Sequence, residues 1–207
     1  MTTLLQIDSS ITGPNSVSRT LTTAIVEKLR EANPGLRVIH HDLAAAAPAH
    51  VTPANFPSAH PISAAAGDAP EFAAGRAASD AILDEFLGAD IVVIGAPMYN
   101  FSIPSQLKAW IDRILVPGKT FSYGAEGLKG LAAGKRVIIA VTRGNFYGPG
   151  QPTASFEHVE TYLRSVFAFV GIPNPEVIIA EGVQLGPDAR QTALDKALQQ
   201  TAGLNAA

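Results

Sequence analysis

Short runs of aliphatic and β-branched residues alternate along the chain with segments of helical periodicity, and this alternation constrains the fold more than any other feature. The predicted strands are residues 4–7, 36–39, 91–96, 137–141 and 177–180. The predicted helices run from Val17 to a stop signal at Asn33-Pro34-Gly35, and then over about 71–87, 104–114, 155–170 and 187–202. Strands that alternate with helices predict an α/β fold, in which a doubly wound parallel sheet is covered by helices on both faces.

The chain gives no sign of a second domain. Its 207 residues are one domain's length, or two at most, and they contain no internal repeat and no block of like charges. We therefore expect residues 1–207 to form a single domain. Residues 44–70 interrupt the alternation because they are rich in Ala and Pro and lack periodicity. They predict an excursion with short helices at best, and long loops of this kind are usually functional or mobile.

The composition excludes several kinds of chemistry. Cysteine is absent, which rules out disulfides, thiolate nucleophiles and iron–sulfur clusters. The five histidines show no metal-ligand spacing, so we expect no metal site. A formal charge of −3 offers no basic footprint for a nucleic acid. Any redox chemistry must therefore come from a bound cofactor.

Neither the first residues nor the apolar runs indicate export or membrane insertion. Residues 1–10 lack the basic region and the long apolar region of a secretory signal. The longest apolar runs are the size of a strand, far below the roughly 18 residues that span a bilayer. We expect a cytoplasmic protein with no membrane partner.

Ligands of doubly wound sheets bind beyond the carboxyl ends of the strands, where this chain has residues 9–18, 97–103 and 142–149. The first segment is rich in hydroxyl groups and leads into a helix whose free N–H groups favour an anion, so it is a candidate phosphate site. Ser16 is a candidate N-cap, and Arg19 is a candidate for additional positive charge. Ordinary turn and capping residues would produce the same pattern, so that alternative stays open.

Two familiar nucleotide motifs are absent. No G-x-G-x-x-G follows the first strand. Gly118-Lys119-Thr120 is similar to the end of a P-loop, but Arg113 stands where that motif has glycine, and no strand leads into it.

The second segment places Tyr99, Phe101 and the Asn100 amide directly after a buried strand. Such groups suit a planar heteroaromatic ring. A hydrophobic loop packed on its own domain would have the same composition.

Several segments together resemble a known family. Pro97-Met98-Tyr99-Asn100-Phe101, followed by Pro104-Ser105-Gln106-Leu107-Lys108, resembles the flavin loop of the FMN-dependent NADH:quinone oxidoreductases called azoreductases. These belong to the flavodoxin-like quinone reductase superfamily. Further similar segments follow the family's order: Ser9-Ser10 with Ser16-x-Ser18, Thr120-Phe121-x-Tyr123-Gly124, Thr142-Arg143-Gly144, Phe169-x-Gly171-Ile172 and Ala180-Glu181-Gly182. The resemblance covers nearly all of the chain except about residues 44–75. It implies a flavodoxin-like, five-stranded sheet in the order 2-1-3-4-5.

The resemblance also implies tightly bound FMN. Its phosphate would be held by Ser10, Ser16, Val17 and Ser18, its isoalloxazine ring by Pro97, Met98, Tyr99, Asn100 and Phe101, and the pyrimidine edge of that ring by Thr142, Arg143, Gly144 and Asn145. Tyr123 and Phe169 would line the substrate pocket. Members of the family are homodimers with two FMN sites at the interface, which implies that the partner completes each pocket.

The implied activity is two-electron reduction of quinones and reductive cleavage of azo bonds by NADH, with NADPH as an alternative donor. Hydride would pass through flavin N5 in a ping-pong cycle, with no catalytic side chain. The chain departs from the family's usual Ser-Arg-Gly-Gly loop at Thr142 and at Asn145. A Thr hydroxyl can replace that of Ser, and Asn tolerates left-handed backbone angles.

Two other interpretations remain. One is a flavodoxin-type electron carrier without substrate turnover; such carriers are usually strongly acidic, whereas a charge of −3 is mild. The other is a fold relative that has lost flavin and acts as a binding module, which the intact phosphate and ring loops disfavour.

Overall fold

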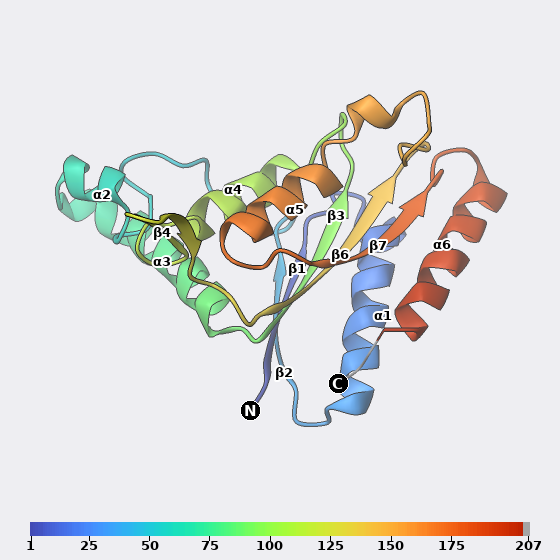
Figure 1. The fold of residues 1–207 in the computed structure, drawn as a ribbon, viewed down its shortest axis with the longest axis horizontal. Helices are drawn as coiled ribbons and strands as arrows, with labels where there is room; N and C mark the ends of the chain where they lie inside the picture. The colour runs from blue at the N-terminus through green and yellow to red at the C-terminus, as the bar shows by residue number, and fades with distance from the viewer. Residues whose placement is uncertain (205–207) are drawn as a thin grey trace.

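The computed structural model describes residues 1–204 and contains a central, five-stranded parallel sheet (Figure 1). Its strands lie in the order β2-β1-β3-β6-β7, and every neighbouring pair is parallel. The strands are β1 (Thr3–Asp8), β2 (Arg37–Asp42), β3 (Ile91–Pro97), β6 (Arg136–Arg143) and β7 (Glu176–Glu181). In chain order this is the 2-1-3-4-5 arrangement, so the prediction of a doubly wound, flavodoxin-like sheet is confirmed.

Two helices pack side by side on one face of the sheet, namely α1 (Val17–Ala32) and α6 (Pro187–Ala202) (Figure 1). Their apolar side chains, such as Leu21 and Ala197, join Leu4 of β1 and Val93 of β3 in one buried cluster. Each helix follows a strand of the parallel sheet, so the amino-terminal ends of both helices lie at the same edge, where the strands end.

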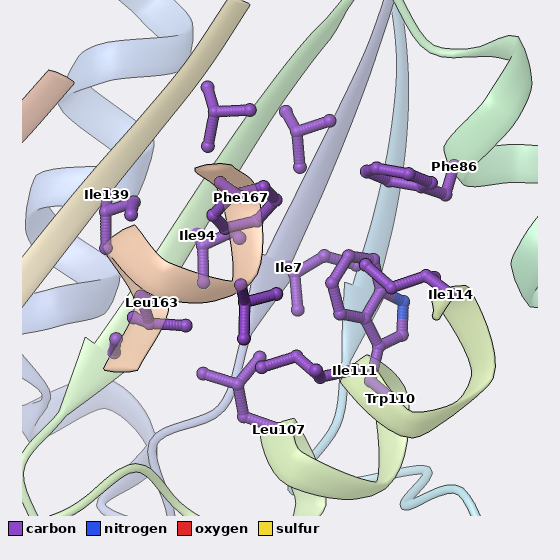
Figure 2. Close-up of a cluster of buried hydrophobic side chains, with 14 of the residues drawn as sticks. Ile7, Phe86, Ile94, Leu107, Trp110, Ile111, Ile114, Ile139, Leu163 and Phe167 are labelled. Atoms are coloured by element: carbon purple, nitrogen blue, oxygen red, sulfur yellow. The ribbon is translucent and has the colours of Figure 1, made fainter. Parts of the chain in front are cut away.

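Three helices cover the opposite face: α3 (Ala73–Gly88), α4 (Ser105–Ile114) and α5 (Glu160–Phe169). Figure 2 shows the cluster beneath them, where Trp110 of α4 packs among aliphatic side chains from the strands. The rings of Trp110 and Phe86 meet edge to face, with centroids 6.0 Å apart. Leu5 belongs to this cluster and Leu4 to the other, because successive side chains of a strand point to opposite faces. The two clusters fix the sheet between its helix layers.

Residues 44–72 form an excursion that contains only a short helix, α2 (Pro61–Ala66), and a single 3₁₀ turn, η2 (Pro70–Phe72). This matches the expectation for the Ala/Pro-rich stretch. Two buried arginines anchor it: Arg113 donates to the backbone oxygen of Ala49 at 2.8 Å, and Arg76 donates to that of Gly67 at 2.7 Å. In Figure 1 the excursion lies beside α3, at the side of the molecule opposite α6.

The predicted start of the fourth helix, at about residue 155, was wrong. The chain forms a 3₁₀ turn, η3 (Ala154–Phe156), and α5 begins only at Glu160. The carboxylate of Glu157 explains the break, because it accepts hydrogen bonds from the backbone N–H groups of Val159, Glu160 and Thr161. This side chain satisfies amides that the start of a helix leaves free.

A small antiparallel hairpin, which was not predicted from the sequence, is formed by β4 (Phe121–Gly124) and β5 (Gly127–Gly130). Its strands are short, and each contains glycine, so they lack the apolar alternation that marks a strand. The hairpin lies against the end of α5, where a Cβ atom on Gly130 would stand 2.1 Å from the backbone nitrogen of Gly171. The backbone of the hairpin therefore packs directly on the backbone at the end of α5.

No helix within residues 1–204 is long and apolar enough to cross a membrane.

Candidate functional site

The carboxyl ends of β1, β3 and β6 lie next to one another, because the register pairs Asp8 with Gly95 and Pro97 with Thr142. The three segments that the sequence singled out therefore meet at one edge of the sheet. They enclose a cavity of about 330 Å³, within the usual range of about 300–1,000 Å³ for small-molecule sites. The predicted site residues that line it are Ser10, Ser16, Val17, Pro97, Met98, Tyr99, Thr142 and Gly144.

A second cavity, of about 710 Å³, adjoins the first, and Met98, Tyr99 and Gly144 line both. Asn100, Phe101 and Asn145 line only the second cavity. Its rim is apolar, since Ile11, Phe101 and Leu185 are exposed there. The site thus has an inner part, lined by the hydroxyls of the loop after β1, and an outer part with three exposed apolar side chains at its border.

Hydroxyl groups gather at the amino-terminal end of α1. Ser16 caps the helix, because its side chain accepts a hydrogen bond from the backbone N–H of Arg19 at 3.2 Å, so the predicted N-cap is confirmed. The hydroxyls of Ser10 and Thr12 lie 3.0 Å apart in the preceding loop. The first amides of a helix have no intrahelical acceptor, so those of Val17 and Ser18 suit an anion.

Ser18 is placed behind this end of the cavity rather than on its wall. Its side chain is buried, and its hydroxyl lies 3.0 Å from the hydroxyl of Ser16. The side chain of Ser18 therefore orients the hydroxyl of Ser16, which does line the cavity.

The loop after β3 is a tight turn with an unusual backbone. The amide of Tyr99 donates to the backbone oxygen of Ser102 at 2.9 Å, and the amide of Ser102 donates back to Tyr99 at 3.2 Å. Between them, Asn100 and Phe101 adopt φ angles of 48° and 74°. Such angles are uncommon outside glycine and cluster at ligand-binding sites. The turn presents Asn100 and Phe101 to the outer cavity.

Arg143 does not line either cavity. Its guanidinium is buried and lies 2.8 Å from a carboxylate oxygen of Glu181, 2.9 Å from Glu160 and 3.2 Å from Glu157. Burial alone would lower the pKa of Arg143, but the hydrogen bond that it donates to Glu181 and the three negative charges raise it. The Arg143 side chain therefore braces the loop after β6 through these ion pairs, and it is not available to a ligand in the cavity.

Two residues that the sequence did not single out, Gln184 and Arg190, line the first cavity. Arg19, the cation considered from sequence, does not: it forms a 2.6 Å salt bridge with Asp42 and borders a different hollow. Gln184 follows β7, and its side chain lies so close to Gly144 that a Cβ there would stand 2.9 Å from it. No local pattern marks either residue, because Gln184 reaches Gly144 only when β7 pairs with β6, and Arg190 reaches the cavity only when α6 packs on α1.

Tyr123 and Phe169 lie together but apart from both cavities. With Phe121 they form an aromatic cluster on the hairpin and the end of α5, in which the ring centroids of Phe121 and Phe169 are 4.6 Å apart. Tyr123 is 71% exposed. Within one chain, these two side chains do not reach the predicted flavin loops.

The residues present fit FMN. Hydroxyls and helix amides at one end of the first cavity suit a phosphate, and Met98 and Tyr99 at the other end offer flat contacts to a ring. Within the described part of the chain, no group of three His, Asp or Glu side chains could hold a metal ion.

The sheet order, together with a hydroxyl-rich loop and an aromatic loop at its carboxyl edge, defines a flavodoxin-like protein. The chain belongs to the family described as having the flavodoxin-like fold, whose model matches residues 2–204.

Named relatives narrow the assignment from the fold to a class of enzyme. FMN-dependent NADH:quinone oxidoreductase 2 of Bradyrhizobium diazoefficiens is 57% identical over 204 residues, which cover 99% of each chain. FMN-dependent NADH:quinone oxidoreductase of Methylorubrum extorquens is 55% identical over 204 residues, again 99% of each chain. An azoreductase structure from Bacillus anthracis superposes with a TM-score of 0.85 at 30% identity and covers 98% of each chain. The resemblance to the quinone oxidoreductase and azoreductase family is therefore confirmed.

Proposed function

We propose that this chain is an FMN-dependent oxidoreductase that uses NADH to reduce quinones by two electrons and to cleave azo bonds, with NADPH as an alternative donor. The observation that carries the proposal is one cavity that joins the hydroxyls of Ser10 and Ser16 to the ring loop at Met98 and Tyr99. The names of the relatives, which specify FMN, NADH and quinone, support the same chemistry.

The inner cavity gives each part of FMN its partners. Ser10 and Ser16, with the amides of Val17 and Ser18, hold the phosphate. Pro97, Met98 and Tyr99 contact the ring from the side of β3, and Thr142 and Gly144 border its pyrimidine edge. Asn100, Phe101 and Asn145 contact the ring from the outer cavity. Arg143 acts on this edge only through the loop that it braces.

When held by these residues, FMN would supply the redox chemistry, with hydride transfer through its N5. The chain's own residues need only bind and orient. The apolar rim at Ile11, Phe101 and Leu185 receives the flat rings of donor and acceptor in turn and limits the access of water. Because both would use one site, ping-pong kinetics follow. No side chain is required to carry a proton or to form a covalent bond.

The substrate pocket is completed by a second copy of the chain. Tyr123 and Phe169 lie outside both cavities of their own chain, so as pocket residues they would have to face the flavin of a partner. The exposed side chains of Tyr123, Leu128 and Leu131 support an interface at the hairpin. We place the homodimer in the cytoplasm, where NADH is available.

The visible spectrum and a turnover assay test the proposal. The purified protein should show flavin absorbance, and mixing it with NADH and a simple quinone should cause rapid loss of NADH that depends on both FMN and quinone. A colourless protein that gains no turnover when FMN is added would sink the proposal. A flavoprotein that stabilises a semiquinone and barely oxidises NADH would instead be the electron carrier.

The proposal that a second copy of the chain completes the substrate pocket is tested separately, by sedimentation and by substitution. The protein should sediment as a dimer, and Tyr123→Ala should raise KM for quinone while the affinity for FMN stays unchanged. A monomer with full activity would contradict the shared site without touching the assignment of FMN.

A further inference from the structure

Arg190 lies near the start of α6 and lines the end of the inner cavity where the serines gather. Its Nη2 donates a hydrogen bond to the backbone oxygen of Asn15, the residue directly before the helix cap Ser16. Asn15 and Arg190 are 175 positions apart in the sequence, and they meet because α6 packs on α1.

The positive charge of Arg190 has no counter-charge within the part of the chain that the structure describes. No carboxylate of residues 1–204 lies within 4.0 Å of it. Its position near the amino terminus of α6 is also unfavourable for a cation, because the helix dipole is positive there. The bond to Asn15 uses one of the five N–H donors of the guanidinium. The remaining charge and donors would be stabilised by an anion in the cavity.

The other groups at this end of the cavity are neutral. Ser10, Thr12 and Ser16 contribute hydroxyls, and α1 contributes amides. The nearby Arg19 cannot add its charge, since Asp42 neutralises it at 2.6 Å and its Nη2 also donates to the backbone oxygen of Ser10. Arg190 is thus the cation of this cavity wall, and a phosphate would meet dipoles alone without it.

We propose that Arg190 binds the phosphate of FMN and makes the inner cavity selective for the phosphorylated flavin over riboflavin. The inference rests on the proposed placement of the phosphate beside Ser16. A guanidinium presents planar N–H pairs that match phosphate oxygens, and such charge-assisted hydrogen bonds are stronger than neutral ones. Arg190 also ties α6 to the loop before α1, so that binding of the phosphate would join the first and last helices.

The test measures dissociation constants of flavin-free protein for FMN and for riboflavin by quenching of flavin fluorescence. Arg190→Gln should weaken FMN binding roughly tenfold or more, as expected for a hydrogen bond to a charged group, and should leave riboflavin binding within about twofold. Raising the salt concentration should weaken FMN binding to the wild type more than to Arg190→Gln. Arg30→Gln, an exposed position at the far end of α1, is the matched control for loss of one positive charge.

The possible outcomes distinguish the role of Arg190 from the proposed placement of the FMN phosphate at the serine loop. If Arg190→Gln weakens FMN and riboflavin equally, Arg190 only supports the loop and the inference fails. If FMN binding is unchanged, the inference fails while the serine loop stands. A wild type that binds riboflavin as tightly as FMN would overturn the phosphate placement itself. Arg190→Lys should restore part of the preference for FMN, since it keeps the charge but not the planar donors.

Discussion

The hydroxyl of Tyr99 lies 3.1 Å from the backbone nitrogen of Ile11 and 3.3 Å from the hydroxyl of Ser10. Tyr99 belongs to the loop after β3, and Ile11 and Ser10 belong to the loop after β1. One side chain therefore joins the two loops that line opposite parts of the inner cavity. Because Tyr99 also contributes its ring to the wall, it couples the geometry of the phosphate end to that of the ring end.

Tyr99→Phe should weaken FMN binding without unfolding the protein. The substitution keeps the ring but removes the oxygen that accepts from the Ile11 amide, a loss of about 0.5–1.5 kcal/mol, or roughly 2–10-fold in affinity. Fluorescence titration of flavin-free protein measures it. Tyr162→Phe is the matched control, since Tyr162 lies on α5 and lines neither cavity. Equal affinities for Tyr99→Phe and the wild type would show that the link is not needed.

Gly130→Ala should destabilise the hairpin that carries Tyr123. A Cβ at Gly130 would stand 2.1 Å from the nitrogen of Gly171 and 2.3 Å from the carbonyl carbon of Val170, so the backbone must shift. Overpacking of this kind costs about 1–3 kcal/mol, which urea unfolding would measure. We also expect a higher KM for quinone with little change in FMN affinity, because the hairpin moves and the flavin loops do not.

Gly124→Ala is the control within the same hairpin, because no atom lies within 4 Å of its added Cβ. Its stability should match that of the wild type within about 0.5 kcal/mol. If the two alanine variants unfold at the same urea concentration, close packing at Gly130 is not what holds the hairpin.

Features with a local pattern were the ones that the sequence predicted. The last helix was expected over 187–202 and is α6 (Pro187–Ala202), because Gly186-Pro187 opens it and its composition is helical throughout. The three ligand segments follow strands, so the parallel sheet alone brings them together. Arg190 could not be found in this way: its contact with Asn15 depends on how α6 packs on α1, and Arg19 was the nearer candidate in sequence.

Arg143→Met should cost far more stability than Arg164→Met. Arg143 is buried among three carboxylates, and removing it leaves Glu157, Glu160 and Glu181 without their shared counter-charge. Breaking a buried ion pair from one side costs about 3–5 kcal/mol. Arg164 contacts the same Glu160 at 2.9 Å, but its side chain is 44% exposed, so its loss should cost about 0–1 kcal/mol. Urea unfolding of the flavin-free protein measures the stability of the two variants.

The Arg143 variant should also bind FMN more weakly. Glu181 accepts a hydrogen bond from the amide of Tyr147 at 2.9 Å while it pairs with Arg143, so the brace holds the loop that contains Gly144. Arg143→Met with the wild-type affinity for FMN, or with a stability no lower than that of Arg164→Met, would contradict a bracing role.

The stability of the protein should fall in acid partly through Glu157. Burial alone raises the pKa of this carboxyl, but the backbone N–H groups of Glu160 and Thr161, the Thr161 hydroxyl and the charge of Arg143 lower it below its ordinary value of 4.5. A pKa that is lower in the folded state stabilises the fold above the unfolded value, and this contribution is lost as pH falls through the folded value. The loss therefore begins near pH 4.5 and continues below it.

Glu157→Gln isolates this contribution. The amide keeps an oxygen to accept from the first turn of α5 but cannot ionise, so the variant should be less stable at pH 7 by about 1–3 kcal/mol. The difference from the wild type should shrink as pH falls below 4.5, because protonation removes the same charge from the wild type. Glu126→Gln, in the exposed turn between β4 and β5, is the matched control for the loss of one surface carboxylate. Urea unfolding between pH 7 and pH 3 gives the three curves, and a constant gap between Glu157→Gln and the wild type would mean that the charge of Glu157 does not stabilise the start of α5.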